Sequence, residues 1–154
     1  METGNLLAVL SVVTIVAGVG IGSMVWAYVG AGSQEVLFKD PILVDLLPTT
    51  AAINALQQGC LEYQAGQYQR AIDSFNQAIL LDPACAEAFH NRGLSWANLR
   101  RDDDATLNLV KASELYLARS DRPSVEIIKQ NLTALKARKV ARETAKSKKS
   151  PKVG

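Results

Sequence analysis

A period of 34 residues constrains the fold of this chain more than any other feature of its sequence. Small residues return at this spacing in four pairs: Ala52 and Ala86, Gly59 and Gly93, Ala71 and Ala105, Ala78 and Ala112. Such a period is typical of stacked helix–turn–helix units, and helices are expected at about 51–65, 68–81, 84–99 and 103–119. A glycine inside a helix costs about 1 kcal/mol relative to alanine. The two glycines therefore indicate that a neighbouring helix approaches closely there.

The first copy of the repeat has a specific pattern. Residues 59–71 read G-C-L-E-Y-Q-A-G-Q-Y-Q-R-A, and Phe75, Ala78 and Asp82-Pro83 follow. This pattern resembles the tetratricopeptide repeat (TPR). In the second copy, Arg100 stands where Gly66 stood, and Leu117 replaces Pro83. The resemblance implies an all-α fold whose residues 51–119 form two TPR hairpins, 52–85 and 86–119.

A further helix is expected after the second hairpin, over residues 123–140. Its apolar residues keep helical spacing: Val125, Ile128, Leu132 and Leu135. It is expected to cap the repeat stack. Residues 141–154 form a basic tail without an apolar face, which is expected to be disordered. Repeat stacks usually need about three units for stability, so two units and one capping helix make self-association plausible.

An N-terminal transmembrane helix is predicted over residues 6–30, after a stub of residues 1–5. The stretch has no charged side chain, and at 1.5 Å per residue it would span about 37 Å, enough for a bilayer core. Trp26 and Tyr28 stand at its end, where aromatic residues favour the membrane interface. A cleaved signal peptide is the alternative, but residues 1–5 contain no Lys or Arg and the apolar core is long.

Two further expectations concern this span. Thr14, Gly18 and Gly22 share one helix face, as small residues do where transmembrane helices pack together. All 17 Lys and Arg residues follow the span, with Lys39 nearest to it. The positive-inside rule then places the TPR domain on the cytoplasmic or stromal side of a single-pass membrane protein.

Residues 31–50 form a linker in which Asp40-Pro41 predicts the start of a short apolar helix. That helix would cap the stack or lie on the membrane.

Charge is unevenly distributed along the chain. Residues 1–128 hold 8 basic and 14 acidic side chains, whereas residues 129–154 hold 9 basic and 1 acidic. The eight basic residues from Lys136 to Lys152 suit contact with anionic lipid, or they simply solvate the tail. The absence of aromatic side chains among them argues against nucleic acid as a partner. Cys60 and Cys85 are expected to remain thiols, since their sites differ in height by about 12 Å.

The sequence shows no catalytic constellation. His90 is the only histidine, which excludes a paired-histidine metal site within one chain. There is no glycine-rich phosphate loop and no nucleophile elbow. The run Asp102-Asp103-Asp104 is interpreted as the acidic first turn of a helix, although a metal site is the alternative. We therefore expect no enzyme activity, no cofactor and no metal.

The resemblance assigns binding to the concave face formed by the first helix of each unit. Its positions in this chain are, in order along the chain, Ile53, Leu56, Gln57, Cys60, Gln64, Glu87, His90, Asn91, Leu94 and Asn98. No Lys or Arg stands among them, which argues against the terminal-carboxylate binding of some family members. The lining suits a helical or extended partner segment with apolar anchors. The alternative is that two units form too little groove, and that these residues pack on the linker or the fifth helix.

The whole layout also resembles small membrane-anchored TPR proteins of photosystem I assembly in cyanobacteria and plastids. The run from Ala86 to Gly93 is similar in style to cyanobacterial repeat proteins. This resemblance implies a scaffold or assembly factor that binds a protein client at the thylakoid membrane. A permanent structural subunit of a membrane complex and an organelle protein-import receptor remain the alternatives.

Overall fold

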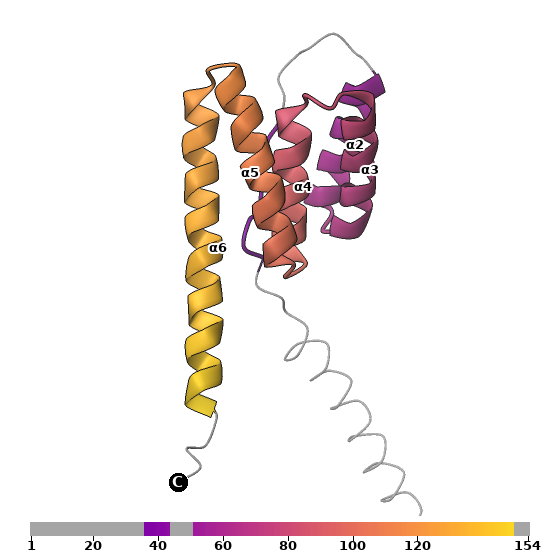
Figure 1. The fold of residues 1–154 in the computed structure, drawn as a ribbon. Coiled ribbons are helices and arrows are strands. Elements are labelled where there is room, and N and C mark those ends of the chain that lie inside the picture. The colour runs from indigo at the N-terminus through magenta and orange to yellow at the C-terminus, as the bar shows by residue number, and fades with distance from the viewer. Residues whose placement is uncertain (1–35, 44–50, 150–154) are drawn as a thin grey trace, which may run out of the picture. The chain divides into compact units, whose positions relative to one another are not determined.

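The computed structural model describes residues 36–43 and 51–149, and within these ranges the chain is all-helical apart from its connections. Two hairpins are formed by α2 (Ala51–Gln64) with α3 (Tyr68–Leu81) and by α4 (Ala86–Asn98) with α5 (Asp102–Ala118). The long helix α6 (Arg122–Lys149) packs on α5 (Figure 1). The two hairpins confirm the helices expected from the 34-residue period.

The turn between α2 and α3 and the turn between α4 and α5 each contain one residue in the left-handed conformation. Gly66 has φ 74°, and Arg100, one period later, has φ 64°. The main-chain bonds are equivalent too: Gln67 N to Glu62 O at 2.9 Å, and Arg101 N to Trp96 O at 2.9 Å. The second unit therefore keeps the same turn although arginine replaces glycine. The left-handed conformation is strained for a residue with a side chain. The end of the second unit does change. Without a proline at Leu117, α5 continues to Ala118.

The mid-helix glycines lie where neighbouring helices approach, as the sequence predicts. A Cβ at Gly59 would collide with the buried ring of Phe75 on α3. A Cβ at Gly93 would lie 3.0 Å from Leu109 Cγ and 3.2 Å from the main-chain oxygen of Ala105. The core around them is continuous from the first hairpin to α6, where Val125, Ile128 and Leu135 are buried.

The C-terminal helix is longer than predicted. The disordered tail expected from residue 141 onwards is wrong for residues 141–149, because α6 continues to Lys149 and extends beyond the other helices (Figure 1). Alanine, lysine, arginine and glutamate dominate this stretch and are good helix formers. The helix is also held from its flank, since Arg138 and Arg142 both form ion pairs with Asp102. Residues 150–154 lie outside the described ranges.

The short helix predicted from Asp40-Pro41 onwards is also wrong for the part that the structure describes. Residues 36–43 are non-helical, and this segment, indigo in Figure 1, runs beside α4. Residues 44–50 lie outside the description, as do the predicted span of residues 6–30 and Thr14, Gly18 and Gly22 within it. No helix in the described part of the chain is long and apolar enough to cross a membrane.

Candidate protein-binding groove

The carboxamide of Asn98, near the end of α4, is buried and makes four hydrogen bonds. Its Oδ1 accepts from the main-chain N–H groups of Leu37 and Phe38, each at 3.1 Å. Its Nδ2 donates to Phe38 O and to Tyr63 Oη, each at 2.8 Å. The Tyr63 hydroxyl in turn donates to Phe38 O at 2.6 Å. With two acceptor and two donor contacts, the amide is fully satisfied despite its exposure of only 2%.

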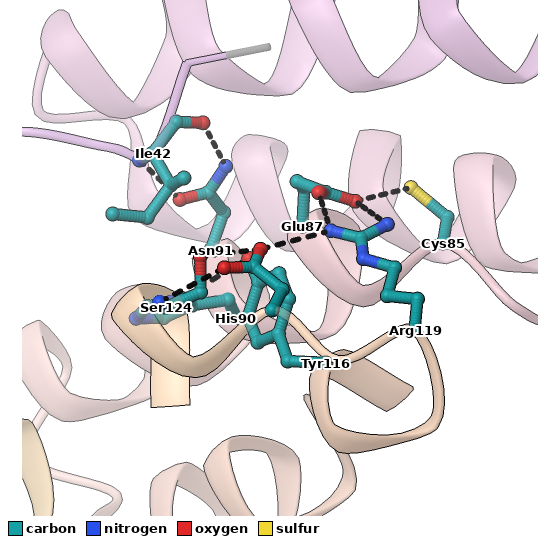
Figure 2. A network of polar contacts seen from close by, with 9 residues as sticks. Ile42, Cys85, Glu87, His90, Asn91, Tyr116, Arg119 and Ser124 are labelled. Atoms are coloured by element: carbon teal, nitrogen blue, oxygen red, sulfur yellow. Dashed lines mark hydrogen bonds and ion pairs between the residues drawn. The ribbon is translucent and has the colours of Figure 1, made fainter. Parts of the chain in front are cut away.

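Asn91 repeats this arrangement two helical turns earlier. Its Oδ1 accepts from Ile42 N at 2.6 Å, and its Nδ2 donates to Ile42 O at 2.8 Å, as Figure 2 shows. Nδ2 also lies 3.5 Å from Cys60 Sγ, and that thiol lies 3.7 Å from Ile42 O. Asn91 therefore binds both the N–H and the C=O of one residue, as a neighbouring strand would.

The register of these contacts defines the conformation of the bound segment. Asn98 binds Phe38 and Asn91 binds Ile42, so the segment runs antiparallel to α4. The two asparagines are separated by about 10 Å along the helix axis, at 1.5 Å per residue. Four residues cover such a distance when extended, at about 3.3 Å each, but not when helical. Every second residue of an extended chain faces the same way, which explains why residues four apart both face α4.

Side chains of the segment add apolar contacts. Leu37 and Phe38 are half-buried against the core, and Pro41 is buried, while Lys39 and Asp40 are exposed. Proline has no N–H, so its burial leaves no donor without a partner. The groove therefore accepts an extended chain through main-chain hydrogen bonds and a few apolar side chains.

The ten positions predicted for the concave face separate into four groups, of which the last, His90 and Glu87, faces the second half of the molecule. Asn91, Asn98 and Cys60 contact the segment directly. Gln57 and Gln64 on α2 are exposed, and Ile53 is half-buried. Leu56 and Leu94 are each 2% exposed and belong to the core. The interpretation of Leu94 as an accessible groove residue is wrong, because its side chain is buried in the core.

His90 and Glu87 connect α4 to the second half of the molecule. His90 Nε2 lies 2.9 Å from Asn131 on α6, and its Nδ1 lies 3.4 Å from the hydroxyl of Tyr116 on α5. Burial lowers the pKa of His90 to about 4. Glu87 forms an ion pair with Arg119, and this hydrogen bond raises the pKa of Arg119 (Figure 2). His90 thus joins α4 to α5 and α6, and Glu87 joins α4 to Arg119 at the end of α5. For His90, Asn91 and Asn98, the structure therefore matches the alternative interpretation of the sequence, in which groove residues pack on the linker or on the fifth helix.

The groove's electrostatics are neutral. Burial raises the pKa of the Cys60 thiol to about 11, so this thiol is protonated at neutral pH. Burial also raises the pKa of the Tyr63 hydroxyl, which stays a donor. Both cysteines are free, as predicted.

Tyr63 was not predicted as a binding residue from the sequence, because its ring packs in the core and only its hydroxyl reaches the segment. The signal that could have indicated it is the combination of an apolar ring with a polar tip.

The acidic run at the start of α5 has a structural role. Asp102, Asp103 and Asp104 stand in its first turn, as predicted. Asp102 pairs with Arg138 and Arg142 of α6, while Asp104 pairs with Arg101 at 2.7 Å. Arg138 also donates to the main-chain oxygen of Ala97 at 2.7 Å. In residues 36–43 and 51–149 no group of three or more acidic, histidine or cysteine side chains has the arrangement of a metal site.

Comparison with known proteins supports this description of the repeat. A family model described as TPR repeat matches residues 59–99, which extend from the second half of α2 to the end of α4. The match supports the resemblance of this part of the chain to the tetratricopeptide repeat family. No curated protein and no solved structure gave a significant match to the chain. TPR repeats are typical of protein-interaction scaffolds, and the TPR fold is typically non-catalytic.

Proposed function

We propose that this chain is a membrane-anchored TPR scaffold that binds an extended segment of a protein client in the groove between α2 and α4. The observation that carries the proposal is the pair of buried carboxamides, Asn91 and Asn98, each bonded to both the N–H and the C=O of one residue. A buried polar group is costly unless it is hydrogen-bonded. Two such groups at one repeat surface therefore favour a surface that binds main chain.

Recognition through the main chain has a consequence for specificity. A peptide backbone offers the same N–H and C=O groups whatever its side chains, and apolar pockets add the selectivity. The hydrogen bonds that hold residues 36–43 come from four neutral side chains, those of Asn91, Asn98, Tyr63 and Cys60. A groove of this kind suits an apolar, extended client segment better than a strongly charged one.

The proposed location is a membrane surface. Residues 6–30 supply the predicted anchor, and the TPR domain lies on the cytoplasmic or stromal side. The exposed lysines of α6, among them Lys136, Lys139 and Lys146, add a second contact with anionic lipid. The layout favours an assembly factor for a photosynthetic membrane complex. The rival is a permanent subunit held through Thr14, Gly18 and Gly22; transient, sub-stoichiometric association of the client would favour the assembly factor.

The test is recovery of the client from gently solubilised membranes with the tagged full-length chain. The variant Gln57→Arg/Gln64→Arg places two charges on exposed groove positions of α2. Its matched control, Gln69→Arg/Gln77→Arg, places the same charges on exposed positions of α3. We expect the groove variant to lose most of the client and the control to retain it, with equal thermal melts. Equal recovery by both variants would place the client outside the groove.

A further inference from the structure

We propose that residues 36–43 are an intramolecular ligand of the client groove, so that a client segment binds only by displacing them. This inference rests on the proposed function and adds a regulation of the same site. Residues 36–43 occupy both asparagine contacts, through Phe38 and Ile42. No second chain segment can use these carboxamides while the internal one is bound.

The segment is held as a peptide ligand is held. Its hydrogen bonds to the groove come from main-chain groups of Leu37, Phe38 and Ile42. When the segment leaves, water or a second peptide can satisfy the same groups on both sides. Lys39 and Asp40 are exposed between the two contacts, so the middle of the segment contributes little burial. A permanent part of the core would instead bury apolar side chains throughout.

The bound segment also defines the chemistry of a competing client. It presents two apolar residues at the Asn98 end, two solvent-exposed residues, then a proline and an apolar residue at the Asn91 end. The position of Pro41 is buried and requires no N–H donor. We infer that the client segment is extended, has apolar residues at the positions of Phe38 and Ile42, and accepts proline immediately before the second of them.

The size of the competition follows from tethering. A ligand joined to its site by a short linker has an effective concentration of about 1 mM. If the free segment binds with a Kd of about 10–100 µM, it lowers the apparent affinity of a client by about 10–100-fold. A client of micromolar intrinsic affinity would bind weakly until it is present at high local concentration, as at a crowded membrane surface.

The first experiment compares the full-length chain with a variant whose residues 36–43 are replaced by eight Gly and Ser residues, both in detergent micelles. The probe is a fluorescent synthetic peptide of residues 36–43, and its binding is measured by anisotropy. We expect the replaced variant to bind at least tenfold more tightly than the unmodified chain. Adding Asn91→Ala/Asn98→Ala to the replaced variant should abolish binding. Equal binding to both chains would overturn the proposal, as would no binding to a replaced variant with a cooperative melt.

A second peptide separates main-chain recognition from apolar adhesion. N-methylation at Phe38 and Ile42 removes two of the three N–H groups from which the asparagines accept hydrogen bonds, and it keeps every side chain. This peptide should bind the replaced variant at least tenfold more weakly than the unmodified peptide. Equal affinity of the two peptides would mean that the asparagines do not recognise the main chain, and the proposal would fail.

Cys60 gives a measurement that does not depend on the replaced variant. Its thiol is 6% exposed and lies beside Ile42 O. In a Cys85→Ser background, Cys60 is the only remaining thiol. The pair Asn91→Ala/Asn98→Ala should raise the rate of maleimide labelling at Cys60 more than tenfold while the cooperative melt remains. An unchanged rate would show that the segment is not held by these residues.

Client recovery separates this inference from the function on which it rests. If the replaced variant recovers several-fold more client than the unmodified chain, the competition is supported. If both recover the client equally, the groove function stands and the competition is wrong. If neither recovers a client under any condition, the proposed function is wrong, and the peptide and labelling results alone decide whether residues 36–43 are a ligand.

Discussion

Helices α2 and α4 occupy the same place in successive repeats but differ in what surrounds them. Gln57 and Gln64 on α2 are exposed, whereas Asn91 and Asn98, one period later, are 0% and 2% exposed. The surroundings explain the difference. In the described part of the chain, α4 packs against both α3 and α5, while α2 packs mainly against α3. The shorter amides of α4 are also covered by residues 36–43.

This comparison shows that a repeat position does not have a fixed role. The exposed side chains of Gln57 and Gln64 on α2 can be satisfied by water, so their identity matters little to stability. A polar side chain at the equivalent place on α4 must find protein partners, because burial without a hydrogen bond costs about 1–3 kcal/mol. Among the predicted groove positions, the buried polar side chains are therefore those of the second unit: His90, Asn91 and Asn98.

The largest expected effect tests a pair of equivalent groove positions that are buried and apolar in both units. Leu94 and its equivalent Cys60 are both buried. Leu94→Glu would place a charge in the core, so we expect a loss of more than about 4 kcal/mol in the free energy of unfolding, enough to unfold the domain. The control Leu61→Glu, at a 62% exposed position, should change stability by less than about 0.5 kcal/mol. Circular dichroism melts measure both, and a native melt for Leu94→Glu would contradict the burial of this position.

The next effect contrasts Asn98 with Gln64. Asn98→Ala removes four hydrogen bonds and releases the segment at Phe38, so we expect a loss of about 3 kcal/mol. Gln64→Ala should change stability by less than about 0.5 kcal/mol. Urea unfolding of the two variants measures the difference. Equal effects would show that the two repeat positions are equivalent after all.

The third effect is a pH dependence that only the second unit should show. His90 has a folded-state pKa of about 4, because burial disfavours its charged form, against about 6.5 in the unfolded chain. The contribution of neutral His90 to the free energy of unfolding is complete above pH 6.5 and is lost as the pH falls towards 4. At pH 5 the loss should be about 2 kcal/mol relative to pH 8. His90→Leu, which copies Leu56 of the first unit, should flatten the dependence; a flat curve for the unmodified chain would refute it.

The smallest effect concerns the turns. Arg100 adopts the left-handed conformation that Gly66 adopts in the first unit. Arg100→Gly should therefore stabilise the fold by up to about 1 kcal/mol, since glycine relieves the strain. Gly66→Arg should destabilise it by a similar amount. Thermal melts of the two exchanged variants would show the opposite signs, and equal signs would mean that the turns are not equivalent.

The sequence by itself determined the repeat architecture. Its 34-residue period placed the helices of both hairpins to within about two residues at each end, because small residues and turn residues act locally and through nearest neighbours. It also predicted that Gly59 and Gly93 face neighbouring helices. The capping helix and the acidic first turn of α5 followed from helical spacing and from the helix dipole.

Only the tertiary structure decided which concave positions bind and what occupies them. The pattern places Leu94 and Gln57 on one face, but in the structure Leu94 belongs to the core and Gln57 is exposed. The part of the short helix predicted after Asp40-Pro41 that the structure describes, up to Leu43, is instead extended, because Asn91 and Asn98 offer main-chain partners that a local signal does not reveal. Local propensity is a weak preference, and contacts between residues 49 to 61 positions apart outweighed it here.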